Sequence, residues 1–183
     1  MKKILLYIIL ILIIPNTILA GNLITNFSRI HAIDSQPYKI GKWIDIPQIV
    51  VCSTAPITLE GVKAAIDWWT KRGHKLNKNI IFKNKEADII CNEATPIGYI
   101  TIDIGDENTL QKDTSLGTSY VSVLDPIGEI VWTRIYLKFT PNPMVLEHEL
   151  GHGLGFLHYN KVGHLMHEKW AESGWSDIGL NLK

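Results

Sequence analysis

Apolar residues recur along the chain at two different spacings, and these separate the predicted helices from the predicted strands. Within residues 55–76 the spacing is three or four positions, which is one face of a helix: Leu59, Val62, Ile66 and Trp69. Thr58 stands where an N-cap side chain would accept from the first free backbone N–H groups, and Gly73 offers a stop. We therefore expect a helix here that turns its apolar face to the core.

Short apolar runs bounded by turn residues predict β-strands. They occupy residues 46–53, 80–84, 87–92, 97–104, 118–124 and 129–138. The last two runs are joined by Asp-Pro-Ile-Gly, which places proline and glycine as a tight turn requires, so they should form an antiparallel hairpin. Strand, helix and strand in succession favour parallel strands with the helix as crossover. We expect a mixed α+β domain built on a mixed sheet.

A second helix is predicted to begin at Pro-Asn-Pro, residues 141–143. Asn142 can cap it, and Pro143 suits the first helical position, where no N–H donor is needed. An apolar stripe at i, i+4 and i+8 marks the buried face of this helix: Leu146, Leu150 and Leu154. The stripe lies roughly opposite His148 and His152, so the helix should present two imidazoles on its other face.

The first twenty residues have the layout of a secretory signal. Lys2 and Lys3 precede an unbroken apolar run over residues 4–14, and Ala20-Gly21 is the best cleavage junction. Such a run is too short to span a bilayer, which needs about 20 residues. We expect a signal peptide over 1–20, an N-terminal segment over 21–45 and one domain over 46–183. The protein would be secreted or extracytoplasmic, or membrane-anchored if the segment is not cleaved.

The composition of the chain gives no indication of a nucleic-acid partner. The formal net charge is zero, with 46% apolar and 20% charged residues, so no basic surplus points to nucleic acid. We expect a monomer with no membrane partner once the signal is removed. Two cysteines, Cys52 and Cys91, permit one disulfide in an exported chain, whereas in a cytosolic chain they would be reduced core residues. If the apolar runs that they end are neighbouring strands, the two could pair; both readings stay open.

The stretch HELGHGLGFLH, residues 148–158, carries the candidate chemistry. His148 and His152 lie one helical turn apart, so both imidazoles can reach one metal ion at about 2.0–2.1 Å. Glu149 lies too far around the helix to be an equal ligand, but it can reach a water on the metal as general base. Alone, His-Glu-x-x-His also occurs by chance in unrelated helices.

The extended pattern adds Gly155 and His158. A straight helix would carry His158 away from the other two histidines, whereas glycine adopts positive φ and commonly ends helices. A turn at Gly155 would bring His158 back to the same metal. Three histidines leave one coordination position open, which is the arrangement of a catalytic rather than a structural zinc.

This pattern resembles the metzincin clan of zinc endopeptidases. Met166, eight residues after His158, resembles the methionine of the metzincin Met-turn at the matrixin spacing, with some astacin-like features upstream, and the similarity covers roughly residues 46–170. The resemblance implies a zincin domain with a five-stranded mixed twisted sheet, a crossover helix, an active-site helix and a Met-turn. It also implies a protein or peptide substrate lying along an edge strand near residues 119–124. Two positions depart from the better-known members: Tyr159 follows the third histidine, and Glu168 follows the Met-turn.

Alternatives remain at several positions. The same fold could serve as a non-catalytic exported module that binds metal or protein, although an intact Glu149 argues against this, and a hydrolase of another amide is a third possibility. Calcium could bind weakly at three acidic residues: Asp103, Asp106 and Glu107. His164 and His167 should support the site rather than ligate, and His31 and His74 should be exposed. Trp170 and Trp175 either line a substrate pocket or cover a short C-terminus.

Overall fold

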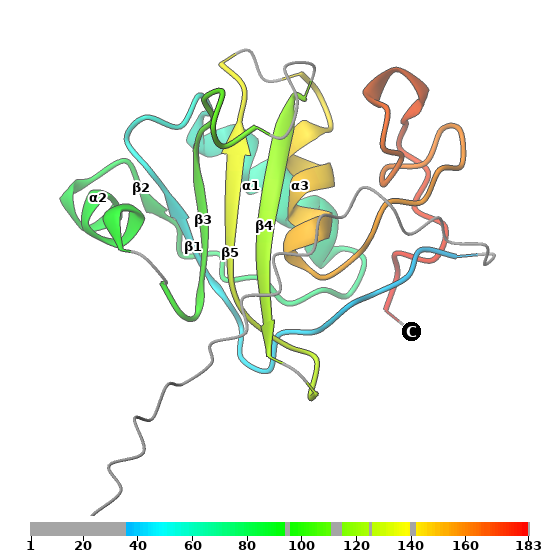
Figure 1. The fold of residues 1–183 in the computed structure, drawn as a ribbon, viewed down its shortest axis with the longest axis horizontal. Coiled ribbons are helices and arrows are strands. Elements are labelled where there is room, and N and C mark those ends of the chain that lie inside the picture. The colour runs from blue at the N-terminus through cyan, green and yellow to red at the C-terminus, as the bar shows by residue number, and fades with distance from the viewer. Residues whose placement is uncertain (1–35, 94–95, 111–114, 125, 140–141, 183) are drawn as a thin grey trace, which may run out of the picture.

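The centre of the protein is a five-stranded mixed sheet with strand order β2-β1-β3-β5-β4 (Figure 1). The structure is a computed structural model that describes residues 36–93, 96–110, 115–124, 126–139 and 142–182. Its strands are β1 (Gln48–Val51), β2 (Ile81–Phe82), β3 (Tyr99–Ile104), β4 (Gly117–Leu124) and β5 (Glu129–Leu137). Every neighbouring pair is parallel except β4 with β5. The predicted mixed α+β architecture is confirmed at this level.

The predicted signal segment, residues 1–20, and His31 lie outside the described residues. Within the described ranges, no helix is both long and apolar enough to span a membrane.

Two helices, α1 (Leu59–Thr70) and α3 (Val145–Gly153), pack against one face of the sheet and form the main core with it. Helix α1 connects the parallel strands β1 and β2, so it is the predicted crossover. Thr58 caps it, because its side chain accepts from the Gly61 N–H at 3.1 Å. Its buried residues are Val62, Ala65, Ile66 and Trp69. The helix predicted within residues 55–76 is confirmed together with its cap.

The strand predicted at residues 87–92 is wrong, because these residues lie in a helix, α2 (Lys85–Asn92). The Asn84 side chain caps it by accepting from the Ala87 N–H at 2.8 Å. Ala87 and Ile90, three positions apart, are buried against Val50 of β1, while Ile89 is 57% exposed. Helix α2 covers the opposite face of the sheet and stands apart from α1 and α3 (Figure 1).

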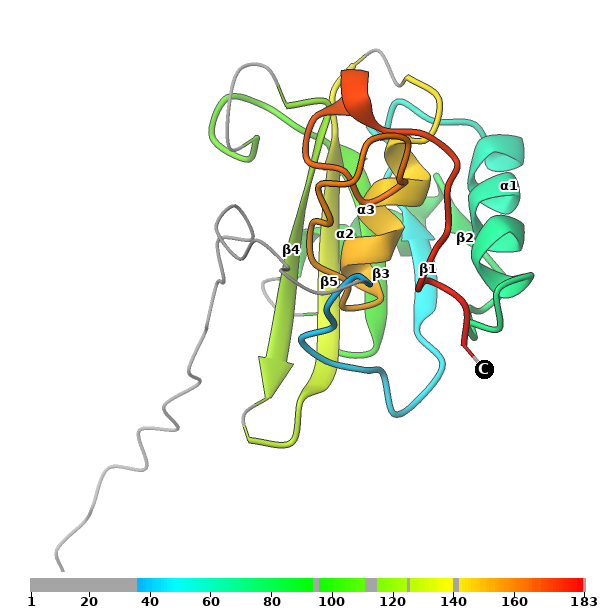
Figure 2. The same cartoon turned by 90° about the vertical axis from the view of Figure 1, so that its right-hand side faces the viewer.

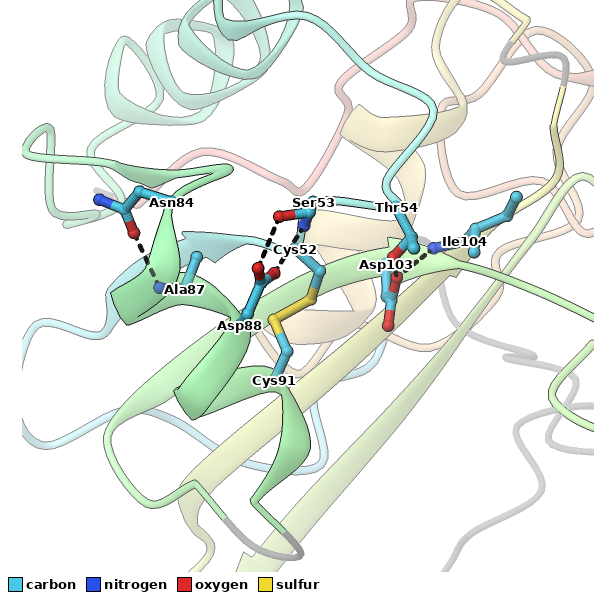
Figure 3. The surroundings of a disulfide bond; sticks show 9 residues. All are labelled: Cys52, Ser53, Thr54, Asn84, Ala87, Asp88, Cys91, Asp103 and Ile104. Atoms are coloured by element: carbon cyan, nitrogen blue, oxygen red, sulfur yellow. Dashed lines mark hydrogen bonds between the residues drawn. A yellow bond between two sulfur atoms is a disulfide. The ribbon is translucent and has the colours of Figure 1, made fainter.

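A disulfide between Cys52 and Cys91 ties α2 to the end of β1 (Figure 3). The two Cα atoms are 6.0 Å apart. Beside the bridge, the backbone N–H and the hydroxyl of Ser53 both donate to the Asp88 carboxylate, at 3.2 and 2.8 Å. The bridge therefore joins a strand end to a helix rather than two neighbouring strands.

The hairpin of β4 and β5 forms the edge of the sheet beside α3. The two strands pair antiparallel, as predicted, with a bulge between Ser122 and Val123. Alternate residues of β4, Gly117 and Ser119, face α3, where both contact Glu149. Because side chains alternate between the two faces of a strand, every second residue at the start of β4 faces the predicted catalytic residue.

Helix α3 begins two residues later than predicted. Its N-cap is Met144 at φ +70°, which makes no side-chain capping bond. Asn142 and Pro143 lie in a turn before the helix, in which the Val145 N–H donates to the Asn142 carbonyl at 3.4 Å. The indole N–H of Trp170 donates to the Pro143 carbonyl at 3.1 Å. The predicted stripe of Leu146, Leu150 and Leu154 is buried.

Candidate metal centre

The three predicted ligand histidines converge. The Nε2 atom of His152 lies 3.1 Å from Nε2 of His148 and 3.1 Å from Nε2 of His158. One ligand atom from each imidazole lies within 4.8 Å of the others, and the described residues contain no other such group of three or more. Two ligands at 2.0–2.1 Å from one tetrahedral ion are about 3.3 Å apart, so the observed spacing fits a metal ion.

Backbone carbonyls fix the protonation of two of these rings. Nδ1 of His148 donates to the Leu165 carbonyl at 2.7 Å, and Nδ1 of His152 donates to the Phe156 carbonyl at 2.7 Å. Because a carbonyl oxygen only accepts, Nδ1 carries the proton and Nε2 keeps its lone pair toward the centre. This is the form that binds a metal, with the outer hydrogen bond that orients a ligand histidine.

Burial keeps these imidazoles neutral. It lowers the pKa of His148 to about 4, and the Leu165 carbonyl only partly opposes this. It also lowers the pKa of His152 well below the ordinary histidine value, with His158 and His148 as further causes. Near pH 7 these two rings therefore offer neutral nitrogens and do not have to release protons before a cation binds.

A glycine turn brings His158 back, as the sequence predicted. Helix α3 ends at Gly153, and Gly155 has φ +94°. The Gly155 N–H donates to the His152 carbonyl at 2.8 Å and the Phe156 N–H to the Gly151 carbonyl at 3.0 Å. This pair of bonds is the Schellman motif, which ends helices at a left-handed residue. A Cβ at position 155 would lie 2.5 Å from the Gly41 carbonyl oxygen, so glycine is required on two grounds.

Met166 is fully buried and packs against helix α3. Its sulfur lies against the Cα of Gly151, where a Cβ would collide with it. The Met166 carbonyl accepts from the Tyr159 N–H at 2.8 Å, and its N–H donates to Nδ1 of His164 at 3.0 Å. The segment around Met166 therefore supports the helix and also supplies the Leu165 carbonyl that orients His148.

Glu149 is buried next to the triad and held by strand β4. The Ser119 hydroxyl donates to Oε2 of Glu149 at 2.6 Å. Gly117 gives the carboxylate room, since a Cβ there would lie 2.8 Å from Oε1. Burial raises the pKa of Glu149 to about 7, while the Ser119 hydrogen bond opposes the rise. Such a carboxyl can exchange a proton near neutral pH. The motif predicts Glu149, and the resemblance places Ser119 on the edge strand expected to bind substrate, but the sequence does not predict that Ser119 and Gly117 contact Glu149.

A cavity of about 530 Å³ opens beside the triad and Glu149. Its lining comes from the start of β4, from the first turn of α3 and from residues between 165 and 173. Trp170 lines the cavity and is 44% exposed. Of its two expected positions, lining a pocket or covering the C-terminus, it takes the first. Trp175 lies outside this cavity, with its ring 6.1 Å from Trp68.

The remaining predicted residues take supporting positions. His164 is fully buried, and its Nε2 bonds the Ile178 carbonyl at 3.0 Å. His167 accepts from the Lys169 N–H at 3.1 Å, and its Nε2 lies 3.3 Å from Glu172. Neither belongs to the ligand group. Tyr159 is buried with its ring edge-on to His164, and Glu168 lines the cavity.

The structure also bears on two other expectations, the exposure of His74 and a calcium site at three acidic residues. The prediction that His74 is exposed is wrong: it is buried, with Nε2 2.6 Å from the Leu180 carbonyl and its ring edge-on to Trp69 and Phe156. The acidic residues considered for calcium form no metal-binding group among the described residues. Instead, Asp103 in β3 accepts from the Ile104 N–H and the Thr54 hydroxyl, and Asp106 accepts from Asn108 and Thr109 in a local turn.

No model of a known protein family matches the chain, and no curated protein matches it. The chemistry of the site therefore has to be inferred from its own residues.

Proposed function

We propose that this chain is an exported zinc-dependent endopeptidase, the activity that its resemblance to the metzincins implies. One observation carries the proposal: three Nε2 atoms converge within 4.8 Å, beside the buried carboxylate of Glu149. Metal ligands alone would suit many functions. A buried carboxyl with a pKa near 7 in the same cavity points to proton transfer next to the metal.

Zinc is the ion that we propose for this site. Imidazole nitrogen suits several divalent transition metals, and three histidine ligands are a common catalytic zinc set. A zinc ion held by His148, His152 and His158 would leave one coordination position open and lower the pKa of a water there to about 7.

The protein's own groups would move the proton. Glu149 would take a proton from the water that attacks the peptide carbonyl and deliver it to the leaving amine. Ser119 holds one oxygen of that carboxylate at 2.6 Å, which restricts its rotation. The Leu165 carbonyl orients His148, and Met166 packs against Gly151 of α3, so the helix that carries His148 and His152 would need little rearrangement during the reaction.

The edge strand β4 would position the substrate. It pairs with β5 on one side and forms the last position of the sheet. An extended peptide can add to such an edge through main-chain hydrogen bonds. Because Gly117 and Ser119 of β4 contact Glu149, a peptide paired there would pass directly by the catalytic carboxylate.

Export is supported by two independent features. The first twenty residues resemble a secretory signal, and the Cys52–Cys91 disulfide is typical of an oxidising compartment. A thiol titration of unreduced protein recovered from the extracytoplasmic fraction should find no free cysteine.

The proposal is tested with Glu149→Gln in the full chain, with Glu147→Gln as the matched control. Glu147 lies on the same helix but outside the cavity lining. Zinc content and cleavage of a denatured protein substrate are measured for both. We expect Glu149→Gln to keep one zinc per chain and lose at least about a thousandfold in cleavage rate, while Glu147→Gln keeps both.

Two results would overturn the proposal. Undiminished cleavage by Glu149→Gln would mean that Glu149 is not the general base. A wild-type protein that binds zinc but cleaves no peptide bond would favour the non-catalytic metal- or protein-binding module.

A further inference from the structure

An N-terminal strap, residues 36–44, lies along the return turn, residues 154–158, that carries His158 (Figure 2). The Ile40 N–H donates to the Gly155 carbonyl at 2.9 Å, and the Leu157 N–H donates to the Tyr38 carbonyl at 2.9 Å. These bonds flank an antiparallel bridge between Lys39 and Phe156. The return turn has no helix or strand of its own in this stretch, so the strap supplies its pairing.

Trp43 fastens the strap to the end of the active-site helix. Its indole N–H donates to the carbonyl of Gly153, the last residue of α3, at 2.8 Å. That carbonyl is one of the four at a helix end that lack a partner within the helix. The ring of Trp43 packs against both apolar clusters on this side of the sheet. The strap thus closes the point at which the helix ends and the return turn begins.

The other side of the strap is anchored to the hairpin. The Lys42 N–H donates to the Gly128 carbonyl at 2.9 Å, and the Ile130 N–H donates to the Lys42 carbonyl at 2.9 Å. Because β5 starts at Glu129, the strap connects the return turn to the central sheet. Gly41 fits between them only because it has no side chain: a Cβ there would lie 2.8 Å from the Gly128 carbonyl oxygen.

The return turn needs such support because it carries His158 outside the helix that holds the other two ligands. Helix α3 ends at Gly153, and Nε2 of His152 lies 3.1 Å from Nε2 of both other histidines. A shift of the return turn would therefore change the geometry of the ligand group. The strap pairs with residues 155 and 157, on either side of Phe156, whose carbonyl orients His152.

We infer that the strap is a positioning element of the metal centre, so that docking of residues 36–44 and binding of the metal ion strengthen each other. By holding the return turn in place before the ion binds, the strap preorganises His158. Ordering of this residue then does not reduce the free energy of metal binding. Coupling of this kind is reciprocal, so the metal must also hold the strap in place. The inference rests on the proposed function only in taking the triad as a metal site.

The first test measures zinc affinity in Trp43→Phe, which removes the N–H donor while keeping an aromatic ring. Zinc dissociation constants come from competition with a chelating dye. We expect the constant to rise about fivefold, the size of one net hydrogen bond. Ile66→Val is the control, since it weakens a buried position of α1 that makes no hydrogen bond to the strap. It should leave the constant unchanged.

The second test uses the reciprocal effect and needs no altered strap. In the Glu149→Gln background, which prevents self-cleavage, trypsin cleavage after Lys42 in the strap is followed with and without zinc. Cleavage after Lys75, an exposed residue in a loop after α1, is the internal reference. We expect zinc to slow cleavage after Lys42 at least about tenfold more than cleavage after Lys75, because cleavage requires local opening.

Three results separate the inference from the proposed function. Equal zinc affinity in Trp43→Phe and wild type would overturn the inference, and so would equal protection at Lys42 and Lys75. If His158→Ala binds zinc as tightly as wild type, the three histidines do not form the metal site, and the proposed function fails as well.

Discussion

Glu149 shows how much of a site can depend on residues that no motif includes. Its position follows from His-Glu-x-x-His, but its environment comes from Ser119 and Gly117, about thirty residues earlier in the chain. The alternation of a strand puts those two on one face, yet the sequence does not say which helix that face meets. The ligands could therefore be predicted from local spacing, whereas the contacts that tune the carboxyl required the tertiary fold.

At this scale we predict that Glu149→Gln stabilises the metal-free protein above pH 7. Burial raises the pKa of Glu149 from 4.5 to about 7, so the folded state holds its proton more tightly than the unfolded state. Wild type therefore loses stability as the pH rises from 4.5 through 7, and glutamine, which stays neutral, does not. The difference should reach about 3 kcal/mol at pH 8 and vanish below pH 4.5.

Chemical denaturation of both metal-free proteins at pH 4 and pH 8 measures this difference. A constant gap between the two variants across that range would mean that Glu149 does not titrate in the folded state as described.

The helix ends decide whether the three histidines meet. The Schellman motif after α3 follows from Gly155, so the sequence could predict that the helix stops there. The start of α3 could not be predicted in the same way, because Trp170, far along the chain, binds the Pro143 carbonyl in the preceding turn. The short apolar run of Ile89, Ile90 and Cys91 favours a strand in the sequence, although these residues lie in helix α2. Only the cap at Asn84 and the i, i+3 burial of Ala87 and Ile90 mark it as a helix.

Gly155→Ala tests the turn, with Gly163→Ala as its matched control. Both glycines have positive φ, +94° and +81°, so alanine is strained at either position by about 1 kcal/mol. Only at position 155 would the added Cβ meet another atom, 2.5 Å from the Gly41 carbonyl oxygen, whereas at 163 nothing lies within 4 Å. We expect losses in the free energy of unfolding of about 3 kcal/mol and about 1 kcal/mol.

Equal losses in the two variants, measured by urea denaturation of the metal-free protein, would contradict the close approach of the strap to the return turn.

Contacts between distant parts of the chain hold the whole molecule together. His74 illustrates this: an isolated histidine in a polar stretch was expected at the surface, but the C-terminal segment covers it and Leu180 supplies its hydrogen-bond partner. The mixed sheet could be predicted from the succession of elements, but the strand order β2-β1-β3-β5-β4 could not. The packing of the strap and of the C-terminal segment could not, because neither carries a periodic pattern.

The Cys52–Cys91 disulfide should contribute strongly to global stability. It closes a loop with a sequence separation of 39, for which chain entropy gives about 4 kcal/mol. We expect Cys52→Ala with Cys91→Ala to lower the free energy of unfolding by about this amount, and Cys91→Ala alone to lose nearly as much because it also opens the loop. Urea denaturation under non-reducing conditions measures both, and a double variant as stable as wild type would refute this role of the bridge.

The central claim is that the three histidines hold one metal ion that makes the protein a peptidase. It is tested most directly by adding zinc in steps to metal-free wild-type protein while following cleavage of a denatured protein. We predict that activity rises linearly and breaks at one zinc per chain, with no rise in His158→Ala. Full cleavage by the metal-free protein, or a rise that is the same in His158→Ala, would contradict the account.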